Sequence, residues 1–409
     1  MARHSAEVYR RRRIAAAAGA LIVLGVSGGL TYAGVALLQP LPAAAASIIE
    51  PSIAAGAPAE VVTPDWGASG IAASGWAEPL MIAGDDVPRP MASITKIVTA
   101  LVALEALPLG AGEDGPSIEL TPTDEQYYAE AEANAESRVP AFAGQIVTER
   151  DVLEAMLLRS GGNYARTLAD WAYGDEEAFL AAARDWLTVN GLTATTITEP
   201  TGSHTGNAST IADLLKLGAL ALSQPAIAEI VRQPTADIPG VGPIDTTNTL
   251  LGIDGVDGIK TGTTPEAGAC LLFSTDIVVG AESVTVIGAV LGGPDRAAVD
   301  GAVLALIDSV RAGFHEVPVL AEGEELATYS ARWDQNATGI SAEGATVLVW
   351  GDERPILDVA VDDVTTAEAG DVVGVATIST PRDHVTVDII LDGPITDPGP
   401  GWRFANPGR

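Results

Sequence analysis

The sequence predicts an α+β domain followed by a smaller all-β domain. Short apolar, strand-like segments occur at residues 70–76 and again at 268–274 and 283–293, with helical patterns between them. This order indicates an α+β layer in which the late strands pair with the early ones. After about residue 316, alternating and β-branched segments are separated by Gly, Asp and Pro, which is typical of an all-β domain. With 409 residues and a hydrophobic fraction of 47%, the chain is long enough for two domains with buried cores.

The N-terminal region carries the signals of an exported protein. Residues 1–13 form a basic tail with five arginines, and residues 14–38 contain no charged side chain. As a helix, the apolar stretch would span about 37 Å, which is enough to cross a bilayer. Because the basic residues lie on one side only, we expect a single-pass anchor in the cell membrane with the rest of the chain outside. A cleaved signal peptide, with cleavage among the small residues at 41–47, is the alternative.

The remaining segments follow from composition and helix-start signals. Residues 39–66 are rich in Ala and Pro and are expected to be a linker, which leaves 67–315 for the α+β domain and 316–409 for the β-rich domain. The final Gly- and Pro-rich residues are expected to be extended.

Two helix starts can be placed from capping residues. Thr148, with Asp151 three residues later, is a predicted N-cap, and Asp175 is the predicted N-cap of a helix over 176–191. The first of these helices leads into the sequence LEAMLLRSGGNYAR, where the apolar helical pattern stops at Ser160 and then restarts.

The charge balance and the scarcity of metal-binding residues exclude several classes of protein. The chain has 54 acidic and 22 basic residues, a formal net charge of −32, which argues against nucleic acid as a partner. Cys270 is the single cysteine, so no intrachain disulfide can form. The four histidines show no metal-ligand spacing, and we expect neither a metal nor a cofactor.

The segment PRPMASITKIVTALVALEAL at residues 88–107 contains the first candidate for chemistry. Ser93 and Lys96 are three positions apart at the start of a predicted helix, so their side chains share one face of its first turn. The helix beyond them is apolar nearly all round, which predicts burial. Burial lowers the pKa of a lysine, and a neutral amine beside a serine hydroxyl can accept its proton. Backbone N–H groups at the helix start would stabilise a developing oxyanion.

A second candidate is the segment VDGIKTGTTPEAGACLLFS at residues 256–274, whose later part is a predicted strand. The amine of Lys260 and the hydroxyls of Thr261 and Thr263 are suited to holding a carboxylate. Gly262 has no side chain and would let a substrate backbone lie close against the strand.

The motifs S-x-x-K and K-T-G, with SGGN between them at the place of S-x-N, occur in the order found in β-lactamases and penicillin-binding proteins. With SITK, LLRSGGN and VDGIKTGTT in this order, residues 67–315 resemble the D-alanyl-D-alanine carboxypeptidases, the low-molecular-mass penicillin-binding proteins of the serine S11 peptidase type. EPTGSHTGNASTIADLLKL at 199–217 resembles a further segment of that family. The resemblance implies a β-lactamase/penicillin-binding transpeptidase-like fold, with 316–409 as an accessory domain.

The resemblance also implies a mechanism. Ser93 would be the acyl-enzyme nucleophile, Lys96 its general base, and Ser160 the relay that passes a proton to the leaving D-alanine. The N–H groups of Ser93 and Thr263 would form the oxyanion hole, and water would release the shortened peptide.

The implied substrate is a peptidoglycan stem peptide ending in D-Ala-D-Ala. Lys260, Thr261 and Thr263 would bind its terminal carboxylate, with Gly262 beside them. β-Lactams, which mimic that terminus, would be covalent inhibitors.

The second motif departs from the family pattern, which has Ser, one residue and then Asn. Either Ser160 holds the serine place and Gly162 the Asn place, or Asn163 holds the Asn place and Gly161 the serine place. The three residues before Ser160, Leu-Leu-Arg, favour the first register, although Asn163 is retained as a substrate-binding candidate.

Three alternative functions stay open at the level of sequence. A class A β-lactamase would need a glutamate with an asparagine four residues later, and neither Glu176 nor Glu177 has one. A transpeptidase or endopeptidase would use the same motifs. A catalytically weakened penicillin- and peptidoglycan-binding protein would follow from the altered second motif.

Overall fold

The computed structural model describes residues 3–85 and 87–407, and the chain forms two compact units. The α+β unit comprises Gly56–Glu316 and Leu348–Glu353. The β-rich unit comprises Met1–Ala55, Val317–Val347 and Arg354–Arg409. The strands β13 (Phe314–Leu320) and β16 (Ala345–Trp350) contain points at which the chain passes from one unit to the other. The domain boundaries expected from the sequence stay predictions.

The α+β unit is built on a five-stranded antiparallel sheet with the order β10-β11-β12-β2-β3. Its strands are β10 (Val256–Thr264), β11 (Gly268–Val279), β12 (Glu282–Gly293), β2 (Ala68–Ala73) and β3 (Met81–Ala83). β12 pairs with β2, so the predicted pairing of late with early strands is confirmed.

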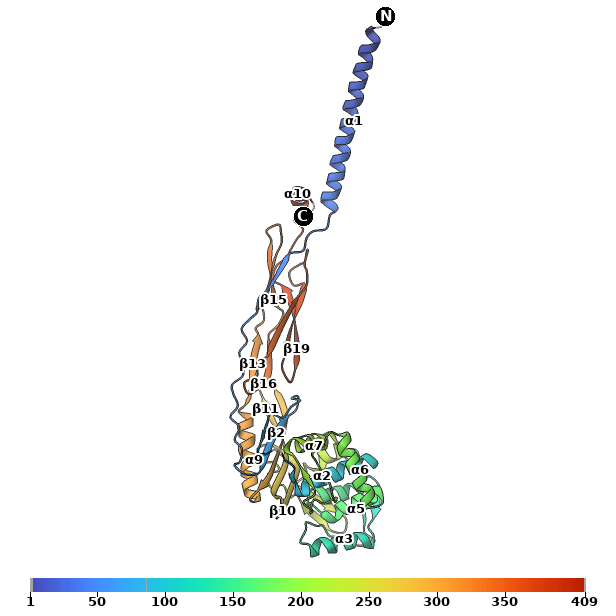
Figure 1. Cartoon of the computed structure of the whole chain (residues 1–409), viewed down its shortest axis with the longest axis vertical. Coiled ribbons are helices and arrows are strands. Elements are labelled where there is room, and N and C mark those ends of the chain that lie inside the picture. Colours follow the sequence, from blue (N-terminus) through green and yellow to red (C-terminus); the bar gives the residue numbers. More distant parts are fainter. Residues whose placement is uncertain (1–2, 86, 408–409) are drawn as a thin grey trace. The chain divides into compact units, whose positions relative to one another are not determined.

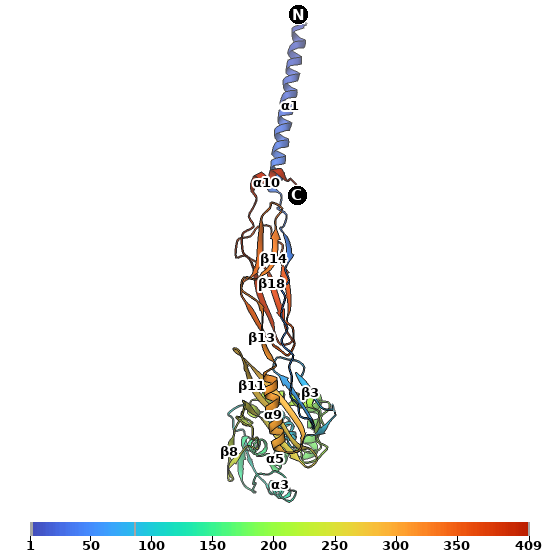
Figure 2. The same ribbon diagram turned by 90° about the vertical axis from the view of Figure 1, so that its left-hand side faces the viewer.

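Helices cover both faces of this sheet (Figure 1). α9 (Arg296–Arg311) packs along one face, where Figure 2 shows it in front of the strands, and α7 (Ile211–Ser223) packs on the other. The helical region beyond α7 contains the segments η1 (Ala92–Ile94), α2 (Thr95–Ala106), α3 (Pro122–Ala133), α4 (Glu149–Leu157), α5 (Gly162–Tyr173), α6 (Glu176–Val189) and α8 (Pro225–Ile230). Short two-stranded sheets are formed by β4 (Arg89–Pro90) with β7 (Ala208–Ser209), β5 (Ser117–Glu119) with β6 (Ile146–Thr148), and β8 (Thr235–Ile238) with β9 (Gly242–Asp245).

Local sequence signals explain the helix boundaries that matter for the site. Thr148 Oγ1 accepts the Asp151 N–H at 3.1 Å while the Asp151 carboxylate accepts the Thr148 N–H at 2.7 Å, a capping box that starts α4. Asp175 accepts the Ala178 N–H at 2.8 Å and starts α6. Both predicted N-caps are confirmed. α2 is buried along almost its whole length, as its apolar composition predicts.

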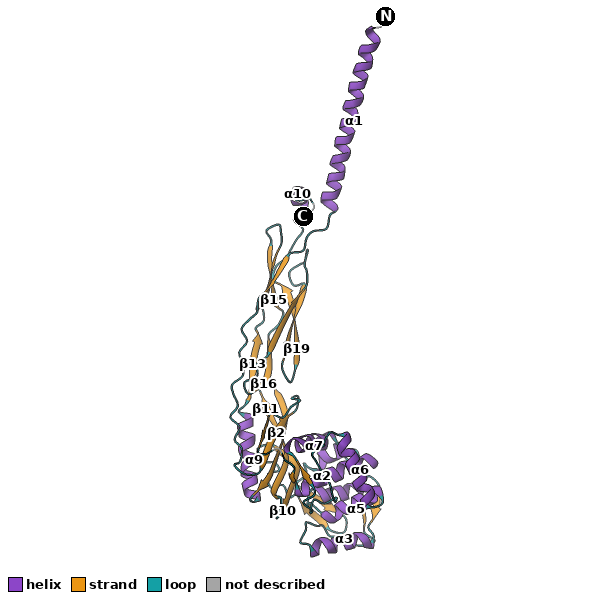
Figure 3. Cartoon of the chain, in the orientation of Figure 1, coloured by secondary structure: helices purple, strands orange, loops and turns teal. Residues whose placement is uncertain are grey.

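The β-rich unit contains a six-stranded sheet with the order β1-β14-β15-β19-β18-β17, shown in orange in Figure 3. Its strands are β1 (Ala45–Ile48), β14 (Glu325–Ser330), β15 (Asn336–Ser341), β19 (His384–Leu391), β18 (Val372–Ser379) and β17 (Ile356–Val361). Neighbouring strands are antiparallel, and the edge strands β1 and β17 approach each other, so the sheet nearly closes on itself.

β1 corrects the expectation that residues 39–66 are an irregular linker throughout. Ala45 to Ile48 pair in register with Ser330 to Ala327 of β14. An alanine-rich segment carries little strand propensity of its own, but an open sheet edge offers backbone hydrogen bonds to any residue type. The pairing is therefore decided by tertiary structure.

The long helix α1 (Arg3–Leu38) includes a candidate membrane span, Ala6–Leu38, which by length and composition could cross a membrane. A signal sequence near an N-terminus would meet the same criteria.

The short helix α10 (Gly399–Ala405) corrects the expectation of an extended C-terminal end. It packs on α1, where the Tyr32 hydroxyl donates to the Phe404 carbonyl at 2.7 Å and Arg403 Nη1 donates to the Gln39 carbonyl at 2.8 Å. Proline is tolerated in a first helical turn, and these contacts stabilise a segment that is too short and too rich in Gly to be helical alone.

Candidate active site

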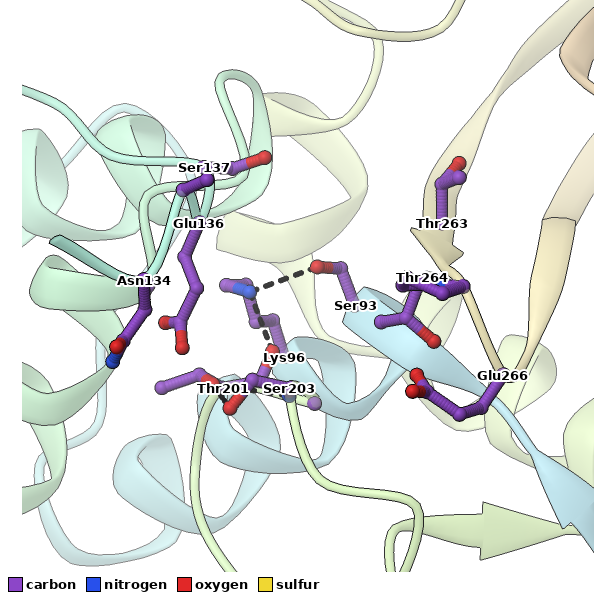
Figure 4. A pocket seen from close by; sticks show the side chains of 14 residues that line it. Ser93, Lys96, Asn134, Glu136, Ser137, Thr201, Ser203, Thr263, Thr264 and Glu266 are labelled. Atoms are coloured by element: carbon purple, nitrogen blue, oxygen red, sulfur yellow. Dashed lines mark hydrogen bonds between the residues drawn. The ribbon is translucent and has the colours of Figure 1, made fainter. Parts of the chain in front are cut away.

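Ser93 lies on the 3₁₀ turn η1, directly before α2, and faces Lys96 (Figure 4). Lys96 Nζ lies 2.9 Å from Ser93 Oγ and donates a second hydrogen bond to the Thr201 carbonyl at 2.5 Å. Ala92, immediately before Ser93, has a φ of 47°, which is uncommon for a residue other than glycine. A side chain at Gly202 would collide with the Ala92 carbonyl, so this glycine is needed where the 199–202 turn meets η1. The geometry of the first helical turn, together with the close contact between the 199–202 turn and η1, therefore places the Ser93 hydroxyl against the Lys96 amine.

The amine of Lys96 is held in a state suited to accepting a proton. Its side chain is 2% exposed. Burial lowers its pKa from 10.5 to about 8, against the opposing effect of the Glu199 and Glu136 carboxylates, which raise it. About one tenth of the amine is consequently neutral at pH 7, far more than for an ordinary lysine.

Lys260 lies on β10, the sheet-edge strand beside η1, and is 1% exposed. Its Nζ donates to the Thr261 carbonyl at 3.1 Å. Burial lowers its pKa well below 10.5, and the positive charges of Lys96 and Arg296 lower it further. Arg296 is therefore the cation that makes this edge of the sheet electropositive, while burial shifts both lysines toward the neutral amine.

Gly262 allows β10 to lie directly against η1. A Cβ atom at this position would come within 2.9 Å of the Met91 carbonyl oxygen and 3.1 Å of the Ser93 backbone nitrogen. From the sequence, Gly262 is expected to allow the close approach of a substrate backbone. The structure gives a second reason for a glycine here, because it lets β10 lie against η1, the turn that carries Ser93.

The two threonines of the KTG segment face different surroundings. Thr263 lines the cleft beside Ser93, and its hydroxyl donates to the Gly262 carbonyl at 2.7 Å. The Thr261 hydroxyl lies 2.6 Å from the Thr247 hydroxyl. Thr261 is not one of the described residues that line the cleft around Ser93.

The cleft around Ser93 has a volume of about 230 Å³. Figure 4 shows Glu136 and Ser137 on one side of the Ser93–Lys96 pair and Thr263, Thr264 and Glu266 on the other. Its lining comprises Ser93, Lys96, Asn134, Ala135, Glu136, Ser137, Gly162, Thr201, Gly202, Ser203, Thr263, Thr264, Pro265 and Glu266. Of the predicted site residues, Ser93, Lys96 and Thr263 are therefore brought together in one cleft.

The second motif is placed differently from the first and third. Ser160 lies between α4 and α5, has a φ of 63° and is 4% exposed. Among the described residues, the lining of the cleft includes Ser137 but not Ser160. Gly162 does line the cleft, and its N–H donates to the Ser137 carbonyl at 2.8 Å. In the favoured register Gly162 takes the place of the motif's Asn, and this glycine lines the cleft.

Asn163 is 1% exposed and is used to hold a loop. Its Nδ2 donates to the Val139 carbonyl at 2.8 Å, and its Oδ1 accepts the Val139 N–H at 3.1 Å. It fixes the segment that carries Glu136 and Ser137 and lies outside the lining of the cleft around Ser93. It also lines a neighbouring cavity of about 280 Å³ that shares Glu136, Gly162 and Thr201 with the cleft, so contact of its amide with substrate stays a prediction.

A group of arginines that no sequence pattern indicated lies next to the cleft. A second cavity of about 460 Å³, which we call the basic compartment, is lined by Tyr128, Glu136, Ser137, Arg138, Arg159, Thr247 and Arg296. It shares Glu136 and Ser137 with the cleft. Arg296 Nη1 donates to the Thr247 carbonyl at 3.3 Å, beside the contact between Thr247 and Thr261. No local pattern marks these arginines, because the antiparallel path β10-β11-β12 and α9 are needed to bring Arg296 back to the KTG strand.

The fold and the site define a penicillin-binding transpeptidase-like domain with a serine and a buried lysine in contact. Residues 80–294, just over half of the chain, match the model of the family Peptidase S11, D-alanyl-D-alanine carboxypeptidase. The chain belongs to this family.

The chain is 31% identical over 202 residues to a D-alanyl-D-alanine endopeptidase of Escherichia coli, and 32% identical over 164 residues to a D-alanyl-D-alanine carboxypeptidase of Mycobacterium tuberculosis. These matches cover 47% and 39% of this chain and 61% and 52% of the two relatives. The chain thus spans roughly half to three fifths of the length of these relatives.

Solved structures agree with the fold. A DD-transpeptidase of Streptomyces is 26% identical, with a TM-score of 0.53 over 64% of this chain and 98% of its own. A peptidoglycan synthesis regulatory factor from Streptococcus pneumoniae, 22% identical, shares the fold with a TM-score of 0.57 over 84% of this chain and 100% of its own.

Proposed function

We propose that this protein is a serine DD-peptidase that acts on peptidoglycan stem peptides ending in D-Ala-D-Ala through an acyl-enzyme on Ser93, with release of the terminal D-alanine as its basic reaction. The observation that carries the proposal is the 2.9 Å contact between Ser93 Oγ and the buried Lys96 amine. The family of the chain and the names of its relatives support the choice of substrate.

In the proposed acylation, neutral Lys96 accepts the Ser93 hydroxyl proton as Oγ attacks the carbonyl carbon of the penultimate D-alanine. The N–H groups of Ser93 and Thr263 stabilise the oxyanion that forms. Collapse of this intermediate breaks the peptide bond and leaves an ester on Ser93, while the departing amine takes up a proton. Water then hydrolyses the ester and regenerates the hydroxyl.

The proton path to the leaving amine has two hydroxyl candidates. Ser160 is the relay expected from the family pattern. Ser137 is the second candidate, because it lines the cleft on the side of the Ser93–Lys96 pair opposite Thr263. Comparing D-alanine release by Ser160→Ala and Ser137→Ala distinguishes them, since loss of the relay slows release far more than loss of a bystander hydroxyl.

The terminal carboxylate needs a cationic partner. Arg296, next to the KTG strand, joins Lys260 and Thr263 as a proposed partner, because its guanidinium can bind a carboxylate through two parallel hydrogen bonds. Lys260 would contribute a buried amine donor on the same strand, and the Thr261 hydroxyl contacts that of Thr247 at the same place.

Labelling with a fluorescent penicillin tests the proposal. The full chain in detergent should form a covalent adduct that survives denaturation, and Ser93→Ala should abolish it. An undiminished adduct in Ser93→Ala, or none in a folded wild-type chain, would refute the assignment.

A second function is favoured by one observation. In the favoured register Gly162 leaves the Asn place of the second motif without a side chain, and a Cβ there would make ordinary van der Waals contacts, the nearest at 3.4 Å to the Ser137 carbonyl oxygen. A penicillin-binding protein with weakened turnover would therefore label on Ser93 but release little D-alanine. Gly162→Asn would then raise D-alanine release relative to labelling.

We further propose that α1 is retained as a membrane anchor and that residues 67–315 form the catalytic domain. In this arrangement residues 316–409 serve as an accessory β domain outside the membrane. The mass of the mature protein isolated from membranes decides whether α1 is kept.

A further inference from the structure

The side chain of Glu136 lies next to the place where the second motif lacks one. In the favoured register Gly162 stands where the family pattern has Asn, and a Cβ atom at Gly162 would be 3.6 Å from Glu136 Oε2. An asparagine side chain here and the Glu136 carboxylate would therefore compete for the same space. The Gly162 N–H donates to the Ser137 carbonyl at 2.8 Å, which holds the residue after Glu136 in place. The cleft thus has a carboxylate where the family pattern has an amide.

The Glu136 carboxylate is directed toward the reacting pair. Figure 4 shows it beside Lys96, with the amine between it and Ser93 in this view. Glu136 raises the pKa of Lys96, and Lys96 in turn lowers that of Glu136, so the two charges lie close enough to interact. In the described chain, however, the hydrogen bonds of Lys96 Nζ go to Ser93 and Thr201. The carboxylate oxygens, which also accept from Asn134, therefore keep capacity for a water molecule.

The surroundings of Glu136 strengthen it as a base. It is half-buried, and burial together with the Glu199 carboxylate raises its pKa, against the opposing charges of Lys96 and Arg166. Glu266 also lines the cleft but is exposed to solvent. Because a carboxylate with a raised pKa holds a transferred proton more strongly, Glu136 is the better base of the two.

The neighbouring cavity of about 280 Å³ meets the cleft at Glu136 and Gly162. Its other lining residues include Tyr127, Arg166 and Glu176, so its wall is polar. A polar cavity of this size has room and hydrogen-bond partners for water. Water can consequently reach Glu136 from this side while an acyl group on Ser93 fills the cleft.

Hydrolysis of the ester needs a base that Lys96 supplies poorly. With a pKa of about 8, about nine tenths of the Lys96 amine is protonated at pH 7. The protonated amine can give a proton to the departing Ser93 oxygen, but it cannot accept one from water. A second group is therefore needed to activate the water.

We infer that Glu136 is the general base of deacylation, the group that takes a proton from the water that hydrolyses the Ser93 ester. This inference rests on the proposed function. The water oxygen forms a bond to the ester carbonyl carbon while Glu136 takes one of the water protons. The bond between this carbon and Ser93 Oγ then breaks, and Lys96 donates a proton to Oγ. Glu136 finally returns its proton to Lys96, which restores both groups and the serine hydroxyl.

The test separates hydrolysis of the acyl-enzyme from its formation. The full chain in detergent is mixed with a pentapeptide ending in D-Ala-D-Ala, quenched with acid and weighed by mass spectrometry. In Glu136→Gln the rate constant for loss of the acyl group should fall about a hundredfold, the usual effect of losing a general base, so acyl-enzyme accumulates. Fluorescent penicillin should still label Ser93 in this variant, and Glu136→Asp should recover part of the rate.

Three matched variants sharpen the result. Glu177→Gln removes an exposed glutamate of α6 that lines neither cavity, and it should hydrolyse the acyl-enzyme as wild type does. Glu266→Gln should lose far less than Glu136→Gln. Gly162→Asn should slow hydrolysis by displacing the Glu136 carboxylate, whereas a protein weakened by the missing Asn would gain turnover from the same change.

Four outcomes would overturn the inference. They are hydrolysis by Glu136→Gln as fast as by Glu177→Gln, loss of penicillin labelling in Glu136→Gln, an equal loss in Glu266→Gln, and faster hydrolysis in Gly162→Asn. In each of these cases penicillin labelling of wild type on Ser93 would leave the proposed function standing. Absence of that labelling in folded wild type would instead remove the proposed function itself.

Discussion

The pH dependence of acylation should report the pKa of Lys96, and Glu136→Gln should move it to lower pH. In the proposed mechanism only the neutral amine accepts the Ser93 proton, so the acylation rate follows the neutral fraction. With a pKa of about 8, this fraction is about one tenth at pH 7 and about one hundredth at pH 6. The rate should therefore rise about tenfold per pH unit up to pH 7 and level off above pH 8.

The sign of the substitution effect follows from the charges around Lys96. Glu136 and Glu199 stabilise the protonated amine and raise its pKa, in opposition to burial. Glu136 can be changed with little effect on the turn, whereas Glu199 accepts the backbone N–H groups of Thr201 and Gly202 and is structural. Removing the Glu136 charge lowers the pKa of Lys96, so more neutral amine is present at pH 6 to 7.

The assay is the second-order rate constant for penicillin acylation, measured by stopped flow from pH 5.5 to pH 9. The midpoint of the profile is compared, rather than its height, because the substitution can also change penicillin affinity. Glu266→Gln is the control, since Glu266 lines the same cleft and is not among the charges that shift Lys96. A midpoint that moves upward in Glu136→Gln, or moves equally in both variants, would show that the reasoning about Lys96 is wrong.

Three further predictions concern packing, a buried charge and the C-terminal helix. Gly262→Ala should abolish penicillin labelling and lower Tm, at a cost of about 1–3 kcal/mol for overpacking against Met91 and Ser93, while Gly301→Ala, where a Cβ meets nothing, should do neither. Glu149 is 1% exposed with both carboxylate oxygens unpaired among the described residues, and burial raises its pKa from 4.5 to about 7. Since the unfolded chain ionises more readily, the wild type should lose about 3 kcal/mol of stability as pH rises from 4.5 to above 7, and denaturation of Glu149→Gln at both pH values should lack this loss. Arg403→Ala should speed amide exchange across α10 without affecting labelling of Ser93, and unchanged exchange would mean that the contacts to α1 do not hold the helix.

Some features of this protein are decided within a few residues of sequence. Ser93 and Lys96 meet because three residues make nearly one turn at the start of a helix, and the apolar residues after them require burial, which lowers the lysine pKa. The N-caps Thr148 and Asp175 act through their own backbone neighbours, so they are readable without tertiary information. The strand patterns also identified the two-part fold, because alternation reflects which face is buried.

Other features depend on contacts between distant segments and carry no local signature. Ala45–Ile48 is a strand because a sheet edge is present to receive it, and α10 is helical because α1 provides partners for its backbone and for Arg403. Asn163 holds Val139 through two hydrogen bonds, a contact between distant segments that no local pattern indicates.

The basic compartment shows this dependence on tertiary structure most clearly. Arg138, Arg159 and Arg296 come from a loop, a helix connection and the start of α9, and only the path of the antiparallel sheet makes them neighbours. The sequence alone therefore determined the reacting pair and the family, because both rest on short-range patterns. Tertiary structure alone decided which charges gather beside the cleft around Ser93, because electrostatic attraction depends on distance in space and not on separation along the chain.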